Sequence, residues 1–141
     1  MASNPSSDRG VEPNEALTDL VVQTSFEVIA IVTRVGAEHD LSLTALRMLG
    51  ILRDRTLTMA ELADQLGLER STVSGLVDRA ERRGLVFRET HASDGRSLQV
   101  RLTEGGMDLV GSAALEVALR IAPLAEGLPA RLESVTPANR G

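Results

Sequence analysis

The chain has 141 residues, of which 43% are hydrophobic, a net charge of −5, two histidines and no cysteine. This length fits one domain, and the absence of cysteine excludes disulfide bonds and a thiol-based sensor. No apolar run approaches the ~20 residues needed to cross a bilayer, and no basic-then-apolar signal pattern opens the sequence, so we expect a cytoplasmic protein without a membrane span.

Charge is distributed unevenly along the chain. Residues 1–69 carry −6, residues 70–101 carry +3 and residues 102–141 carry −2. A locally basic segment in an acidic protein predicts an anionic partner for that segment alone, while the surrounding acid limits nonspecific binding to nucleic acid.

The first long helix is predicted over residues 14–37, after a disordered tail at residues 1–13 that is rich in turn-forming and polar residues. Asn14 caps this helix, and its apolar residues form two stripes that leave little polar face. A helix that is apolar nearly all round must be covered nearly all round, and one small subunit cannot cover it. We therefore interpret it as a dimer interface; the alternative is the central helix of a monomeric bundle.

A second helix is predicted over residues 42–53, capped by Ser42. Its inward positions are Ala45, Met48, Leu49 and Leu52. The preceding Glu38, His39 and Asp40 are potential metal ligands, but consecutive residues do not converge easily on one ion, so we interpret them as a solvated loop. We likewise interpret Arg34, Arg47 and Arg53 as solvated surface cations rather than as an anion site.

Residues 58–83 have the pattern of a helix-turn-helix. Thr58 and Glu61 form a capping box, and Gly67 ends the first helix. The second helix buries four residues at helical spacing: Val73, Leu76, Val77 and Ala80. Its outward and flanking positions, with its first residue, are Arg70, Ser71, Ser74, Gly75, Asp78, Arg79 and Arg82. Short polar side chains allow close approach to a major groove, where Arg can bind guanine with two hydrogen bonds.

A β-hairpin wing is predicted over residues 85–102. Both of its strands alternate apolar and polar residues, and the loop between them has Asp94-Gly95 turn chemistry next to Arg96. A short strand at residues 57–59 could pair with this hairpin. The fold class is therefore mainly α with a small β-hairpin wing (α+β), arranged as a winged helix-turn-helix.

The last long helix is predicted over residues 103–135. Thr103 caps it, and Gly105 and Gly106 weaken its first turn by roughly 0.5–1 kcal/mol each relative to Ala. Pro123 and Pro129 should end or kink it, which leaves a short final helix. Its apolar surface is again too wide for one wet face, so the two terminal helices are expected to build the dimer together.

Residues 61–104 carry a family resemblance. The run Glu61-Leu-Ala, the segment Leu66 to Ser74, Leu76-Val-Asp-Arg, Arg83-Gly-Leu-Val, and Asp94-Gly-Arg-Ser before Val100-Arg-Leu-Thr-Glu resemble the MarR family of transcriptional regulators. Weaker similarity extends from about residue 15 to about residue 121, which spans most of a domain placed at residues 14–135, with its DNA-binding part at residues 42–102.

This resemblance implies a homodimeric regulator, most often a repressor, that binds a palindromic operator in double-stranded DNA and responds to a small effector of unknown identity. It implies base or phosphate contacts by Arg70, Ser71, Thr72, Ser74 and Arg79, a minor-groove contact by Arg96, and support of Arg96 by Asp94. The candidate DNA-binding set is completed by Gly75, Asp78, Arg82 and Ser97. No cofactor, metal or catalytic residue is implied.

Three features depart from the family's pattern. Gly75 stands where many members carry a larger, often basic side chain, Glu69 is a poor helix cap, and the final helix looks short. The sequence itself gives no sign of an effector pocket. The rival functions are a protein-interaction module without DNA binding, which should carry apolar residues on the outward face, and an enzyme, for which no plausible catalytic set exists.

Overall fold

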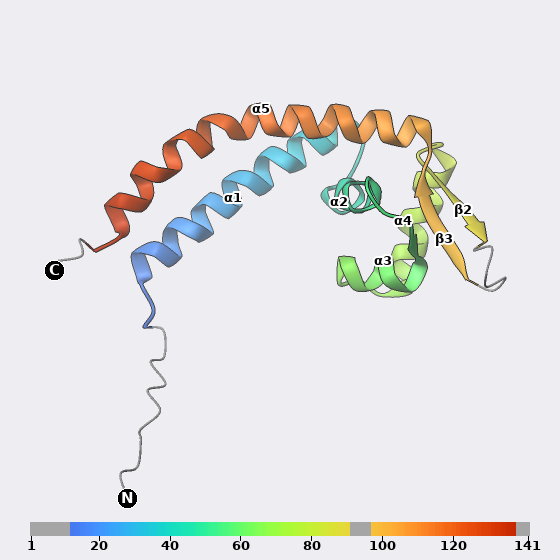
Figure 1. The fold of residues 1–141 in the computed structure, drawn as a ribbon, viewed down its shortest axis with the longest axis horizontal. Coiled ribbons are helices and arrows are strands. Elements are labelled where there is room, and N and C mark those ends of the chain that lie inside the picture. Colours follow the sequence, from blue (N-terminus) through green and yellow to red (C-terminus); the bar gives the residue numbers. More distant parts are fainter. Residues whose placement is uncertain (1–11, 91–96, 138–141) are drawn as a thin grey trace, which may run out of the picture.

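The computed structural model describes residues 12–90 and 97–137. Its elements in chain order are α1 (Glu15–Glu38), α2 (Leu43–Leu52), β1 (Leu57–Thr58), α3 (Met59–Leu66), α4 (Arg70–Arg82), β2 (Val86–Thr90), β3 (Leu98–Leu102) and α5 (Glu104–Val135). The predicted fold class is confirmed, since helices dominate and the strands form one small antiparallel sheet (Figure 1). Most of the predicted N-terminal tail, residues 1–11, lies outside the described residues.

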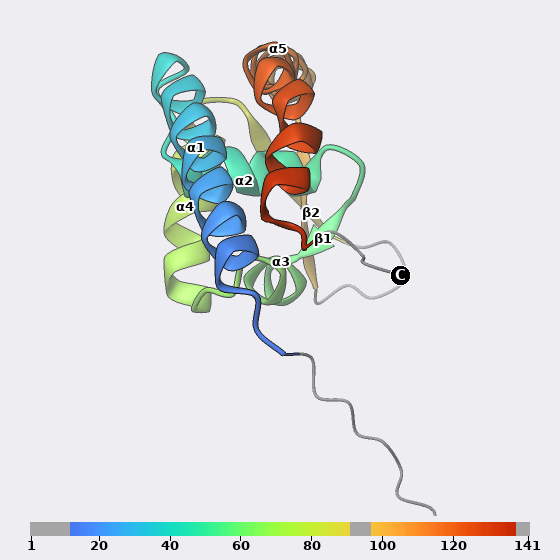
Figure 2. The same ribbon diagram turned by 90° about the vertical axis from the view of Figure 1, so that its left-hand side faces the viewer.

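The molecule divides into an arm and a reading head. The arm is α1 and α5, which lie side by side and extend beyond the reading head, residues 43–102 (Figures 1 and 2). The side-chain amide of Asn14, at the start of α1, donates to the carbonyl of Val135, at the end of α5, at 3.3 Å. The two helices therefore run antiparallel. Further along, Glu27 pairs with Arg131 at 3.1 Å.

A clasp of charged residues joins the arm helices where they meet the head. Arg120 donates to both carboxylate oxygens of Glu38, at 3.0 and 2.6 Å, and His39 Nε2 lies 3.1 Å from Glu116. The hydrogen bond from Arg120 lowers the pKa of Glu38 below its ordinary value. The Glu38–Arg120 pair is therefore intact above the usual carboxylate range and is lost only as the pH falls through the lowered pKa of Glu38. The expectation of a solvated loop is therefore corrected: Glu38 is the last residue of α1, His39 caps that helix, and both side chains have partners on α5.

The expectation that proline would divide the last helix is also wrong. Pro123 and Pro129 both lie inside α5, which continues as one curved helix of 32 residues (Figure 1). Proline removes one backbone donor and crowds the preceding turn, which bends a helix without necessarily ending it. Packing against α1 stabilises α5 as one continuous helix, so no separate short final helix forms.

The hydrophobic core lies in the head and at its junction with the arm. Its fully buried side chains come from α1, α2, α3, α4 and the sheet: Val35, Met48, Leu49, Leu62, Val73, Val77, Val86 and Val100. The predicted short strand forms as β1, where Leu57 pairs with Val100 of β3, and β3 lies between β1 and β2. This sheet fixes the direction of the wing relative to the helix-turn-helix.

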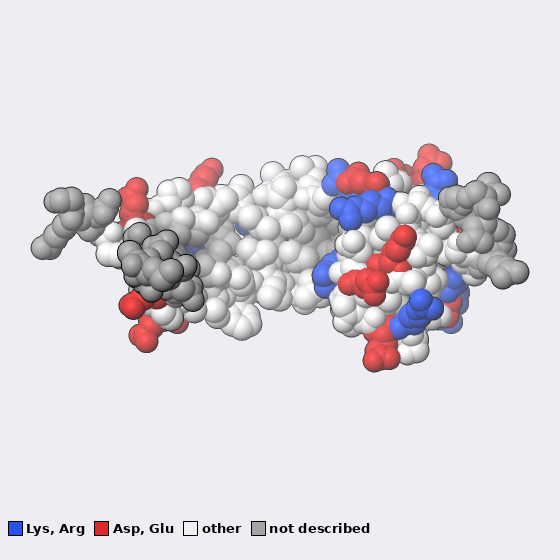
Figure 3. Space-filling model, turned by 60° about the horizontal axis from the view of Figure 1, so that its bottom comes forward, with Lys and Arg blue, Asp and Glu red and all other residues white. Residues whose placement is uncertain are grey.

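The outer arm exposes apolar side chains. Phe26 is 67% exposed, and Leu115 and Leu119 of α5 are 62% and 66% exposed. Figure 3 shows this as a white stretch without charge along the middle of the arm, whereas both signs of charge are interspersed on the head. A soluble chain seldom leaves such a large apolar surface open to water.

The sequence-based exclusion of any membrane-length segment is wrong for α1. Its 24 residues contain an 18-residue window of mean hydropathy 1.5, long and apolar enough by composition to cross a membrane, and only 6% of that window is buried. Such a helix is weak evidence for a membrane span, because interface helices of soluble proteins have the same character. Glu27, near the middle of α1, forms its ion pair with Arg131 within the arm.

Candidate nucleic-acid interface

The helix-turn-helix begins with the predicted capping box. The Glu61 amide donates to Thr58 Oγ1 at 3.2 Å, and the Thr58 amide donates to Glu61 Oε2 at 2.9 Å. Gly67 then takes a left-handed conformation with φ of 65°, which a residue with a Cβ adopts only under strain. After this turn the chain enters α4, the candidate recognition helix, at Arg70.

One face of α4 is buried and the other is open. The four predicted core residues Val73, Leu76, Val77 and Ala80 are all buried. Glu69 occupies the cap position and makes no side-chain cap hydrogen bond, as its chemistry predicts. The first amides of α4 therefore keep donor capacity at the end of the helix where an anion would approach.

The structure places most of the predicted contact residues on this open face. Arg70, Ser71, Thr72, Asp78, Arg79 and Arg82 are exposed, and Ser74 and Gly75 are half-buried. Ser97 is half-buried just before β3, on the wing. Asp94 and Arg96, the predicted wing-tip residues, lie outside the described residues. The contacts of all these residues with DNA therefore remain predictions.

Arg88 of β2 belongs to this surface and was missed by sequence reasoning. Its guanidinium donates to Asp78 at 2.7 Å and also pairs with Glu81, so one wing cation neutralises two carboxylates of α4. The hydrogen bond with Asp78 raises the pKa of Arg88, which stays charged at any ordinary pH. The carboxylate of Asp78, predicted at the DNA, is thus committed to a residue of its own chain.

We predict that Arg88→Gln weakens operator binding about tenfold, or ~1.4 kcal/mol. Asp78 and Glu81 would then face the phosphates without compensation. Fluorescence anisotropy with an operator duplex measures the loss. Adding Asp78→Asn to the Arg88→Gln chain should recover most of it; wild-type affinity in the single variant would refute this electrostatic role.

Two other arginines of the basic segment are also used internally. Arg83, just after α4, donates to the carbonyls of Asp40 and His39 at 2.8 and 2.9 Å, which ties the recognition helix to the end of α1. Arg101 pairs with Glu89 at 3.2 Å and lies 6.0 Å from the ring centre of Phe87. The net positive charge of residues 70–101 thus overstates the number of cations available to DNA.

Arg70 and Arg79 form no ion pair within residues 12–90 and 97–137. Both are exposed on the open face of α4. An arginine whose guanidinium is not committed to a carboxylate can form charge-assisted hydrogen bonds with phosphate or guanine at lower cost. These two residues are the strongest described candidates for direct contact with DNA.

Gly75 leaves space on the same face. A Cβ built there would meet only Arg79 Nη1, at an ordinary contact distance of 3.5 Å. We predict that Gly75→Lys folds normally, binds the operator more tightly, and steepens the dependence of log K on log salt by about 0.9 per added phosphate contact. Gly75→Ala is the control, because it adds helix propensity without charge; an unchanged salt slope in the lysine variant would contradict the placement of Gly75 near phosphate.

No group of three potential metal ligands occurs among the residues that the structure describes. Glu38 and His39 have different partners on α5, Arg120 and Glu116. The arrangement of α3, α4 and the sheet is instead that of a surface that reads a groove, with a polar helix and a strand pair beside it.

Comparison with known proteins identifies the group to which this arrangement belongs. A family model described as the MarR family matches residues 39–97, which run from the end of α1 through both helices of the helix-turn-helix to the wing. Over this segment, which is less than half of the chain, the protein is similar to the MarR family. This match supports the predicted resemblance to the family, and the fold class agrees with that of the structural neighbours.

Curated relatives of this chain are named as regulators. It is 31% identical over 91 residues to the HTH-type transcriptional regulator SarZ of Staphylococcus haemolyticus, and 36% identical over 66 residues to the uncharacterized HTH-type transcriptional regulator YfiV of Bacillus subtilis. These alignments cover 64% and 46% of the chain, but only 62% and 41% of the relatives' lengths. The relatives agree with the prediction that the protein is a regulator and not an enzyme.

Solved structures share the whole architecture. RV1404 from Mycobacterium tuberculosis has a TM-score of 0.72 and 28% identity, covering 92% of this chain and 85% of its own. The fold is also shared with a mutant of Staphylococcus aureus MepR bound to an oligodeoxyribonucleotide (TM-score 0.65, 24% identity, 85% and 98% covered). NadR in complex with 4-hydroxyphenylacetate is likewise similar (TM-score 0.70, 22% identity, 91% and 86% covered). The similarities to MepR and NadR show a shared fold alone.

Proposed function

We propose that this protein is a DNA-binding transcriptional regulator: a cytoplasmic homodimer that represses genes by binding a palindromic operator and is released by a small effector. The observation that carries the proposal is the pairing of two surfaces on one chain. The open face of α4 carries Arg70, Ser71 and Arg79, and the arm carries an uncovered apolar surface. The open face of α4 is suited to a major groove, and the apolar surface of the arm is suited to the same surface of a second copy.

The apolar surface supports dimerisation through the arm. Nine large hydrophobic side chains are exposed in the described part of the chain, and all but Leu98 lie on α1 or α5: Val21, Val22, Phe26, Ile29, Met107, Leu115, Leu119 and Leu132. A two-fold axis through the outer arm would cover this set except Met107, which lies at the head end of α5, and would carry one reading head at each side. Two recognition helices about 34 Å apart would then enter successive major grooves, which predicts a palindromic site.

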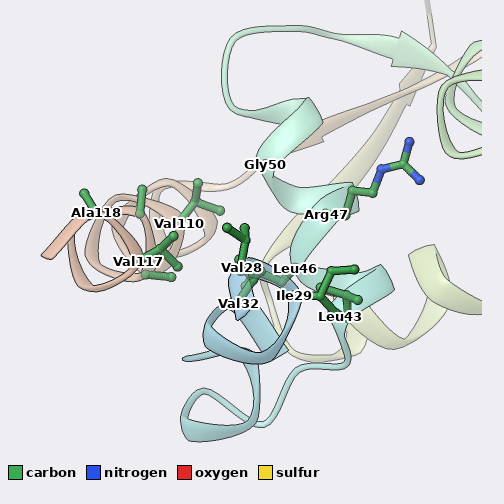
Figure 4. Close-up of a pocket in the computed structure, with 12 residues that line it drawn as sticks. Val28, Ile29, Val32, Leu43, Leu46, Arg47, Gly50, Val110, Val117 and Ala118 are labelled. Atoms are coloured by element: carbon green, nitrogen blue, oxygen red, sulfur yellow. The ribbon is translucent and has the colours of Figure 1, made fainter. Parts of the chain in front are cut away.

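Release by an effector is supported by a hollow between the arm and the head. Its volume is about 470 Å³, and α1, α2 and α5 all contribute to its walls (Figure 4). A ligand there would favour one spacing of the arm and the head over another. The affinity for DNA would then change by the difference in ligand affinity between the two states. This hollow was not visible in the sequence.

The rival function is a winged-helix module that binds protein and not DNA. It would need apolar residues on the outward side of α4, yet the exposed residues of α4 are arginine, serine, threonine, aspartate and glutamate. The core of a protein–protein interface is normally depleted of charged residues. The composition of α4 therefore favours DNA.

The proposal is tested by fluorescence anisotropy with duplexes tiled across the intergenic DNA beside the protein's own coding sequence. One palindromic duplex should bind at least ~1,000-fold more tightly than random duplex at physiological salt, within the range typical of specific regulators. Equal affinity for every duplex at that salt concentration would reject sequence-specific regulation.

A further inference from the structure

The lining of the hollow between the arm and the head is almost wholly aliphatic. Eleven of its twelve lining residues are valine, isoleucine, leucine, alanine or glycine, and the twelfth is Arg47. Leu46, Val110 and Ala113 are buried, so the hollow reaches into the core and is not a shallow part of the arm surface. Gly50 and the alanines of α5 have too little side chain to fill it.

Arg47 does not supply the hollow with a charge. Its guanidinium donates to the carbonyls of Leu66 at 3.3 Å and Gln65 at 3.0 Å, at the end of α3. Figure 4 shows the guanidinium turned away from the apolar side chains, so only the stem of Arg47 borders the space. Arg47 is exposed, as the sequence predicted, and its guanidinium also caps the carbonyl end of α3 in the reading head.

The chemistry of this lining selects the ligand. A carboxylate placed among these side chains would lose its hydration without gaining a partner, which costs several kcal/mol. An anion could recruit Arg47 only by breaking both of its hydrogen bonds to α3. The lining also offers no aromatic ring for stacking. We infer that the effector of this protein is an uncharged, apolar small molecule, recognised by shape and burial; this inference rests on the proposed function as a releasable regulator.

The helices that line the hollow indicate how a bound ligand would change DNA binding. The walls of the hollow come from both arm helices and from α2, which belongs to the head. Filling the space would add contacts between the arm and α2 without disturbing Arg47. The ligand would thus act on the spacing of the two heads and leave the polar face of α4 unchanged, so released protein should keep its nonspecific, salt-dependent affinity for DNA.

A pair of fluorescent probes that differ by one charge tests the inference on the full-length protein. N-phenyl-1-naphthylamine is uncharged, and 8-anilinonaphthalene-1-sulfonate has a similar ring framework with a sulfonate. The uncharged probe should bind at least tenfold more tightly than the anionic one and should weaken operator binding. Preferential binding of the anionic probe, with loss on Arg47→Met, would overturn the inference.

Variants at Gly50 separate the hollow from the exposed arm. No atom lies within 4 Å of a Cβ built at Gly50, so larger side chains fit there and the helix should gain stability. Gly50→Leu should reduce binding of the uncharged probe at least tenfold, whereas Gly50→Ala should leave probe binding within about threefold of wild type. Undiminished probe binding in Gly50→Leu would mean that the arm surface binds it, and would reject the site.

The two proposals fail in different ways. If neither probe binds but the operator is bound specifically, the hollow is filled by the second copy; the inference is then wrong and the regulator stands. If the uncharged probe binds in a Gly50-dependent manner but no operator duplex is preferred, the ligand class stands. In that case the proposed function is wrong.

Discussion

Phe26→Glu is expected to split the proposed dimer and to abolish operator binding at nanomolar protein concentration. Phe26 is 67% exposed in the single chain, so the substitution should cost the folded subunit little. In a two-fold interface every substitution occurs twice, and removal of a central aromatic residue commonly costs about 2 kcal/mol or more. The dimer dissociation constant should therefore rise about 1,000-fold, equivalent to ~4 kcal/mol.

Sedimentation equilibrium over nanomolar to micromolar concentrations measures this shift, and circular dichroism checks that the helices persist. Met107→Glu is the matched control, because Met107 is an exposed apolar residue of α5, at 46%, that lies at the head end of the helix. It should leave the dimer intact. If Phe26→Glu sediments like wild type, the arm is not the interface.

Gly106→Ala is expected to destabilise the fold by about 3 kcal/mol, at the upper end of the range for overpacked cores. A Cβ at this buried position would lie 2.0 Å from the carbonyl oxygen of Leu85, inside van der Waals contact with backbone that cannot move freely. That same carbonyl accepts the Thr103 amide at 3.0 Å, so relief of the clash would disturb the start of α5 and its junction with the head.

The neighbouring Gly105→Ala provides the control. The nearest atoms to its Cβ would be 3.7 Å away, and the exchange should be neutral or stabilise the helix by up to ~1 kcal/mol. Urea unfolding at fixed protein concentration distinguishes the two variants by their midpoints. Equal midpoints would mean that α5 does not approach Leu85 as closely as described.

Local chemistry made much of the reading head predictable. Caps such as Thr58 and the apolar spacing of Val73, Leu76 and Val77 act within one or two turns, so the sequence contains the whole cause of each. The same holds for the left-handed turn at Gly67. These local features were enough to place α3, α4 and the wing strands in order.

The features that sequence reasoning missed depend on packing between distant segments. Arg88, Arg83 and Arg47 look like surface cations in sequence, and only the fold shows which carboxylates and carbonyls they meet. The close approach at Gly106 and the continuity of α5 through Pro123 likewise depend on neighbours far along the chain. The hollow depends on the relative positions of three helices, which no local pattern encodes.

In the proposed dimer, two copies joined by their arms hold two recognition helices at one helical repeat. The most direct measurement is the mass of the complex formed with a palindromic operator duplex, determined by sedimentation alongside the protein alone at micromolar concentration. We predict two chains in the free protein and two chains per duplex, with binding lost when ~5 base pairs are inserted between the half-sites. Single chains in solution, or equal binding to the spaced and unspaced duplexes, would contradict this arrangement.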